Sequence, residues 1–112
     1  MVNADILERY LKDTPQRRMG NLGSELLRLS NAVQRGNLPA AHELMELSLS
    51  YIEVGGMDFP DDTAELLAKL QRVLLAHGRC LDETINNSTR RLQFNRELEI
   101  YSELTIRLMG EC

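Results

Sequence analysis

Apolar residues recur every three or four positions between Pro15 and Arg35. They are Met19, Leu22, Leu26, Leu29 and Val33, at spacings of 3, 4, 3 and 4. An α-helix places residues so spaced on one face, whereas a strand places alternate residues on a face. Thr14 followed by Pro15 is a typical helix start, and Arg35-Gly36-Asn37 is typical of a helix end. We therefore predict an unbroken helix over residues 15–35, with one face that packs on other helices.

The rest of the chain repeats this spacing between turn signals. We predict a short helix that Asn3 caps and that ends near Asp13, and a third helix over residues 39–54. A fourth helix starts after Pro60 and has an apolar face that continues to Leu81; Gly78 weakens this helix without necessarily ending it, and a last helix covers residues 89–109. Asn86 to Thr89 form the break before the last helix, because their side chains compete for backbone hydrogen bonds. Without this break, the last two helices would merge into one long rod that must dimerise to bury its apolar side.

Composition supports an all-helical chain. Aromatic residues make up 4% of the 112 residues, tryptophan is absent and valine is scarce, so the β-branched and aromatic runs of strands are missing. A leucine-rich core suits helix-on-helix packing, and the length suits one domain. We predict an all-α fold, an antiparallel four-helix bundle with a short additional N-terminal helix, as a single domain over residues 1–112.

Two glycines, Gly20 and Gly23, interrupt the predicted helix over residues 15–35. Each costs about 1 kcal/mol relative to alanine in a helix interior, so a close neighbour must offset the cost. That neighbour is either the backbone of another helix or a ligand. A phosphate cradle is the weaker alternative, because no strand precedes the glycines and no Lys-Ser/Thr pair follows them.

Charge and hydropathy limit the classes of partner. The formal net charge is −4, which argues against a nucleic-acid partner, since such proteins need a basic face. No apolar run approaches the roughly 18 residues of a membrane span, and the first residues lack the features of a signal peptide. The two cysteines, Cys80 and Cys112, do not suggest a disulfide framework. We expect a cytoplasmic protein with no membrane partner.

One histidine carries a resemblance to a signalling helix. His42, followed two residues later by Leu44, resembles the phosphoacceptor helix of histidine phosphotransfer domains, which are helical bundles of similar size. That family has a lysine and a glycine after the leucine, where this chain has Met45 and Glu46, and a glutamate would repel a phosphoryl group. The resemblance implies a phosphoacceptor role for His42 alone. An anion-binding signalling domain that uses Arg17 and Arg18 instead is the related alternative, because arginine suits fixed contacts with phosphate or carboxylate.

Catalytic and metal sites are not predicted. A di-iron bundle needs Glu-x-x-His motifs, and no acid stands three residues before His42 or His77. His77 and Cys80 are one helical turn apart, but two ligands do not make a metal site, and no third group accompanies them for nucleophilic catalysis. We expect no catalytic residue, no metal ion and no cofactor, and therefore not an enzyme.

The remaining signal is an excess of apolar residues on the predicted third helix. Tyr51, Ile52 and Val54 are close to consecutive, and Leu47 and Leu49 precede them, so they cannot all face one core. Either this helix is buried nearly all round, or it presents a patch to a second copy or to another protein. With the glycines, the candidate interaction surface is Gly20, Gly23, Leu47, Tyr51 and Val54. The predicted function is a protein–protein interaction or regulatory module, with a homodimer expected.

Several blocks in the first half of the chain carry a family resemblance. They are Thr14 to Arg18, Gly20-Asn21-Leu22, Leu26-Leu27-Arg28 and Tyr51-Ile52-Glu53. These blocks resemble those of small uncharacterised all-helical bacterial proteins, cyanobacterial ones among them. The family has no assigned activity, so the resemblance implies a bacterial, cytoplasmic origin and no mechanism.

Overall fold

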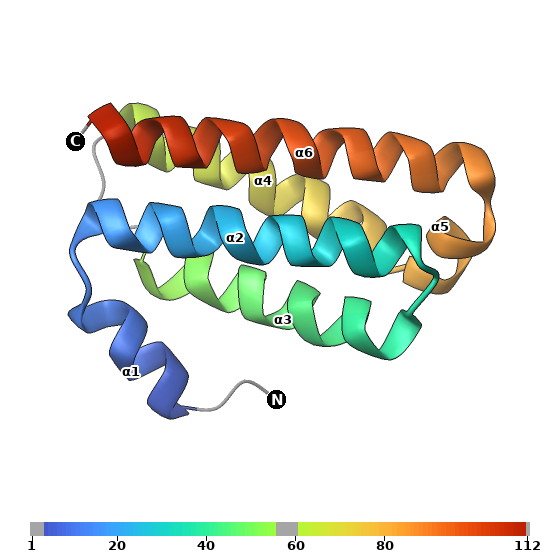
Figure 1. The fold of residues 1–112 in the computed structure, drawn as a ribbon, viewed down its shortest axis with the longest axis horizontal. Helices are drawn as coiled ribbons and strands as arrows, with labels where there is room; N and C mark the ends of the chain where they lie inside the picture. The colour runs from blue at the N-terminus through green and yellow to red at the C-terminus, as the bar shows by residue number, and fades with distance from the viewer. Residues whose placement is uncertain (1–3, 56–60, 112) are drawn as a thin grey trace.

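The computed structural model describes residues 4–55 and 61–111, with the side chains of 15–16, 54–55, 61 and 108–111 left aside. The described residues form six α-helices and no strand (Figure 1). The helices are α1 (Ala4–Lys12), α2 (Pro15–Gln34), α3 (Leu38–Gly55), α4 (Asp61–Gly78), α5 (Leu81–Asn86) and α6 (Ser88–Glu111). The all-helical prediction is confirmed.

Helix α2 begins and ends where its sequence signals lie. The Thr14 hydroxyl oxygen accepts a hydrogen bond from the Arg17 N–H at 3.3 Å, which caps the first turn. At the other end Gly36 has a φ of 68°, a left-handed conformation that glycine adopts without steric cost. The Asn37 N–H then donates to the Ala32 carbonyl at 2.9 Å, which closes the helix end. The Asn37 side chain accepts from the Ala40 N–H and starts α3.

The predicted fourth helix is wrong at Gly78. The structure ends α4 at this glycine and begins the separate helix α5 at Leu81, after a turn at Arg79 and Cys80. The Cys80 N–H donates to the His77 carbonyl at 3.3 Å within this turn. Leu81 is buried on α5, so the apolar spacing continues across the turn. The spacing of apolar residues therefore does not reveal that α4 ends at Gly78.

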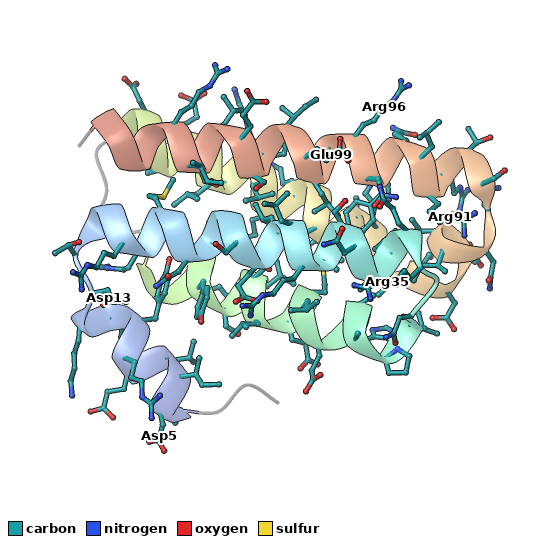
Figure 2. All side chains as sticks on the ribbon, viewed as in Figure 1. Asp5, Asp13, Arg35, Arg91, Arg96 and Glu99 are labelled. Carbon is teal, nitrogen blue, oxygen red and sulfur yellow. The ribbon has the colours of Figure 1, made fainter. Side chains whose placement is uncertain are left out.

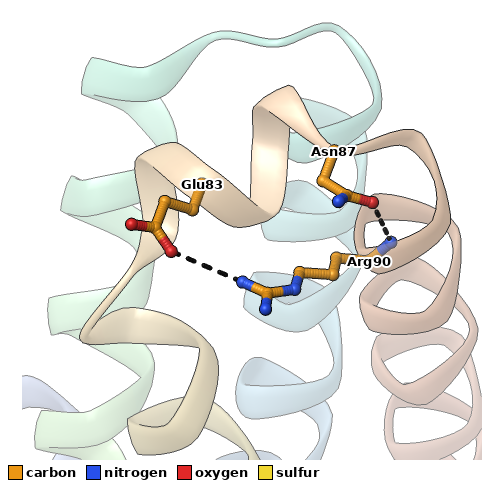
Figure 3. A network of polar contacts seen from close by, with 3 residues as sticks. All are labelled: Glu83, Asn87 and Arg90. Atoms are coloured by element: carbon orange, nitrogen blue, oxygen red, sulfur yellow. Dashed lines mark hydrogen bonds and ion pairs between the residues drawn. The ribbon is translucent and has the colours of Figure 1, made fainter.

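The predicted break before the last helix is confirmed at Asn87. Its side-chain oxygen accepts hydrogen bonds from the N–H groups of Thr89 and Arg90, both at 3.1 Å, and so caps the first turn of α6. Arg90 also reaches back across the break to the Glu83 carboxylate on α5, at 3.4 Å (Figure 3). The two helices are therefore distinct, and the single long rod does not form.

The long helices lie alongside one another around an aliphatic core. Helix α2 lies between α3 and α6, and α4 runs behind α2 and α6 in this view (Figure 1). Hydrogen bonds join Gly23 of α2 to Ser102 of α6, and Ser30 to Asn95. Because the α6 number falls as the α2 number rises, these two helices are antiparallel. No helix in the described part of the chain is long and apolar enough to cross a membrane.

Candidate interaction surface

Helix α6 approaches α2 closely at Gly23. A Cβ atom built on this glycine would lie 2.8 Å from Thr105 Oγ1 and from Ile106 Cγ1, and 3.3 Å from the Ser102 carbonyl oxygen. The Ser102 hydroxyl donates to the Gly23 carbonyl oxygen at 2.8 Å. The expectation of a close helix backbone is therefore confirmed at Gly23. The same contact buries Gly23 inside the chain, so it is not part of an exposed surface.

Gly20 lies one turn earlier, in an open hollow of about 500 Å³. Asp13, Arg17, Asn21, Ser24 and Ile106 line the hollow with it. The Asn21 side-chain amide donates to the Asp13 carboxylate at 3.1 Å. Arg17 is exposed there, but the Asp13 carboxylate gives the same hollow a negative charge. The hollow is thus a poor cradle for a phosphate.

Arg18 does not share this hollow with Arg17. It is buried, and its Nε donates to the Asp13 backbone carbonyl at 3.1 Å, where it ties the turn before α2 to the helix. Its positive charge acts on a buried tyrosine, Tyr10, whose pKa it lowers against a larger increase caused by burial. The two candidate anion contacts are therefore not on one site: Arg17 lines the hollow at Gly20, whereas Arg18 is buried against the turn before α2.

Tyr51, predicted on the interaction surface, is covered by α1. Its ring stacks on that of Tyr10, with centroids 3.9 Å apart and planes 3° from parallel. Burial raises the pKa of the Tyr51 hydroxyl, and the nearby negative charge of Glu25 raises it further. Glu25 accepts from Arg28 at 3.1 Å through one oxygen, while its other oxygen is buried without a hydrogen-bond partner among the described residues. This pair of tyrosines is the main contact between α1 and α3.

The other predicted surface residues on α3 do not form an open patch with Tyr51. Leu47 is partly buried and packs against the core. Val54 lies in α3, but its side chain is outside the described residues. Of the two interpretations of this apolar helix, burial on several sides accounts for Leu47 and Tyr51.

His42 lies on the exposed side of α3. Its side chain is 54% exposed, and its Nε2 atom lies 3.6 Å from the Asp82 carboxylate on α5. It also lines an open hollow between α3 and α4 with Glu46, among other residues. Arg79 lines the same hollow, but the Asp82 carboxylate next to the ring would repel a phosphoryl group attached to it.

His77 and Cys80, the other candidate pair, differ in exposure: the His77 side chain is largely buried, whereas Cys80 is exposed. The His77 ring stacks on Phe94, with centroids 4.3 Å apart, and its Nε2 lies 3.5 Å from the Glu97 carboxylate. Cys80 is exposed at the start of α5. Among the residues that the structure describes, no three His, Cys, Asp or Glu side chains gather as a metal site.

Among the side chains that the structure describes, the two most exposed large apolar residues lie on α6, on the side away from the core. Leu92 is 55% exposed and Ile100 is 56% exposed. Both line a shallow hollow of about 330 Å³ with Thr89, Gln93, Arg96 and Glu97. Arg96 points outward from this helix, and Glu99 lies one turn further along (Figure 2). We call Leu92, Arg96, Glu99, Ile100 and Glu103 the α6 outer face.

Sequence reasoning missed this face because it followed only one stripe of the helix. Phe94, Leu98 and Thr105 are fully buried and belong to the core stripe that the spacing identifies. Leu92 and Ile100 fall outside that stripe, eight residues apart and thus on one side of the helix. The presence of two large aliphatic residues outside the core stripe, Leu92 and Ile100, is the sequence signal that could have predicted the α6 outer face.

The chain was compared with protein-family models, with curated proteins and with solved structures, and none of them matches. The resemblances noted for His42 and for the blocks in the first half of the chain remain predictions.

Proposed function

We propose that this chain is a non-enzymatic interaction module of the bacterial cytoplasm, an antiparallel four-helix bundle with α1 added, which binds another protein through the α6 outer face. The observation that carries the proposal is the exposure of Leu92 and Ile100, each more than half open to water. Burial of aliphatic side chains of this size stabilises a contact by about 1.5–3 kcal/mol each. A partner that covered both would gain most of that energy.

The fold does not use these residues itself. Helix α6 contributes Phe94, Leu98 and Thr105 to the core, and these are fully buried without help from the outer face. Polar and charged side chains surround Leu92 and Ile100, as they surround the apolar centre of many protein interfaces. On the outer face Arg96 lies between Leu92 and Ile100, one helical turn from each, so the face offers a partner helix both aliphatic and charged side chains.

Phosphotransfer at His42 is the weaker alternative. Exposure of the imidazole supports it, since a phosphoacceptor must be accessible to its donor. The Asp82 carboxylate at 3.6 Å opposes it, because negative charge beside the ring destabilises a phosphorylated product. The α6 outer face has no comparable opposing feature.

Site-specific photo-crosslinking in the native host tests the proposal. A photoreactive amino acid is placed at Leu92 or Ile100, and a matched control carries it at Leu75, which is 43% exposed on α4. We expect a discrete protein adduct from Leu92 and Ile100 and none from Leu75. Equal labelling at all three positions, or no adduct at the first two, would contradict the proposed function.

A further inference from the structure

Charge is divided unequally along α6. Its first part, residues 88–98, contains three arginines and one glutamate, whereas residues 99–111 contain three glutamates and one arginine. The helix is therefore positive towards its start and negative towards its end. A second copy of α6 laid against it in the opposite direction would place unlike charges together, and one laid in the same direction would place like charges together.

Three of these charges, those of Arg91, Arg96 and Glu99, lack an ion-pair partner among the described residues, and the last two lie on the α6 outer face. Arg90 pairs with Glu83 and Arg107 with Glu103, and the Glu97 carboxylate lies 3.5 Å from His77 Nε2. Arg96 and Glu99 make no ion pair or hydrogen bond within the described part of the chain. Both are exposed, and Ile100 lies next to them. The α6 outer face thus combines two exposed aliphatic residues, Leu92 and Ile100, with one positive and one negative charge that have no ion-pair partner among the described residues.

We propose that the occupant of the α6 outer face is a second copy of this chain, bound with the two α6 helices antiparallel. This inference rests on the proposed function and names its partner. When the helices cross near residue 98, Arg96 of each copy lies beside Glu99 and Ile100 of the other. The two-fold axis repeats each contact, so the contact of Ile100 and the pair of Arg96 with Glu99 each occur twice in the dimer. Helix α6 lies along one edge of the molecule, so its outer side is open to a second copy (Figure 1).

Complementary charge reversal tests both the partner and its direction. Arg96→Glu gives a chain with two acids at these positions, and Glu99→Arg gives a chain with two bases. Each variant alone would place like charges across an antiparallel contact, whereas a mixture of the two would place unlike charges there. Sedimentation of the purified chain, from low micromolar to near-millimolar concentration, measures the dimer dissociation constant.

We expect wild-type chain to dimerise, each single variant to dissociate with a constant about tenfold higher, and the equimolar mixture to return close to the wild-type constant. Ile100→Asp should raise the constant about 30-fold or more, because two copies of the side chain leave the contact. Leu75→Asp is the control and should leave the constant unchanged. Circular dichroism of each variant checks that the helices stay folded after these exposed substitutions.

Three results would overturn the inference: a monomer throughout the concentration range, a dimer unaffected by Ile100→Asp, or single variants whose mixture fails to recover. A monomer in solution with photo-crosslinks from Ile100 to a different protein would contradict the antiparallel dimer but support the proposed function. A monomer without crosslinks would remove both.

Discussion

At the scale of single residues, the tyrosine pair links the N-terminal helix to the rest of the chain. Tyr10 is the buried residue of α1, and its ring lies on Tyr51 of α3. Burial raises the pKa of both hydroxyls, because a phenolate would lose its hydration in this position. The neutral form of each tyrosine is therefore the one that the folded state favours.

This pKa shift makes folding sensitive to alkaline pH. The unfolded chain releases the Tyr10 proton near the ordinary value of 10.0, while the folded chain holds it to a higher pH. The stabilisation is complete below pH 10 and is lost as the pH rises above it, by up to about 1.4 kcal/mol per pH unit. We expect urea unfolding to show a steeper loss of stability above pH 10 for wild type than for Tyr10→Phe. Equal slopes in the two proteins would contradict this assignment.

At the scale of helices, the contact of α2 with α6 depends on the absence of a side chain at Gly23. Thr105 is fully buried and donates to the Ser102 carbonyl at 2.8 Å, so it cannot move aside freely. We expect Gly23→Leu to lower the free energy of unfolding by about 2 kcal/mol or more through overpacking. Chemical denaturation measures this change directly.

Gly78 provides a matched control for that substitution. A Cβ atom there would lie 3.7 Å from Met45, an ordinary contact, and the backbone is not left-handed. Gly78→Ala should therefore raise the free energy of unfolding, by about 0.5–1 kcal/mol, because alanine restricts the unfolded chain more than glycine does. If both substitutions changed stability in the same direction, the close approach at Gly23 would not be the cause.

The helices themselves were largely predictable from sequence. Thr14 and Pro15 gave the start of α2, Gly36 gave its end, and Asn87 marked the break before α6, because each acts through local backbone hydrogen bonds. The end of α4 at Gly78 was not predictable from spacing, since His77 and Leu81 stay on the buried side across the turn. Local chemistry fixes a helix end, whereas apolar spacing records only which side is buried.

The pairing of helices and the α6 outer face were less predictable. The glycines indicated a close neighbour for α2, but the identity of α6 as that neighbour depends on contacts distant in the sequence. Tyr51 was expected on a surface and is covered by α1, because a short helix with one stacking residue is enough to bury it. Ile100 was overlooked for the converse reason: no other described helix covers it.

At the scale of the whole molecule, α1 is the least secured helix. Tyr10 is its buried residue, and its main contact is with α3, whereas α2 packs on both α3 and α6. Helices with few buried contacts open locally at low cost. We expect backbone amides of α1 to exchange with deuterium well before those at the centres of α2 and α6, as measured by mass spectrometry. Equal protection of all three helices would contradict this order.

The hydrogen bond from Ser102 to Gly23 also has a consequence for the order in which the molecule can assemble. It joins positions 79 residues apart, so the side of α2 that contains Gly23 is covered only after α3, α4 and α5 have been synthesised and α6 has followed them. Helices α2 and α3 can meet as a hairpin as soon as both have left the ribosome, since a short turn connects them. Until α6 has left the ribosome, however, the apolar side of α2 next to Leu22 and Leu26 stays exposed to water. The hairpin of α2 and α3 therefore has an incomplete core while synthesis continues.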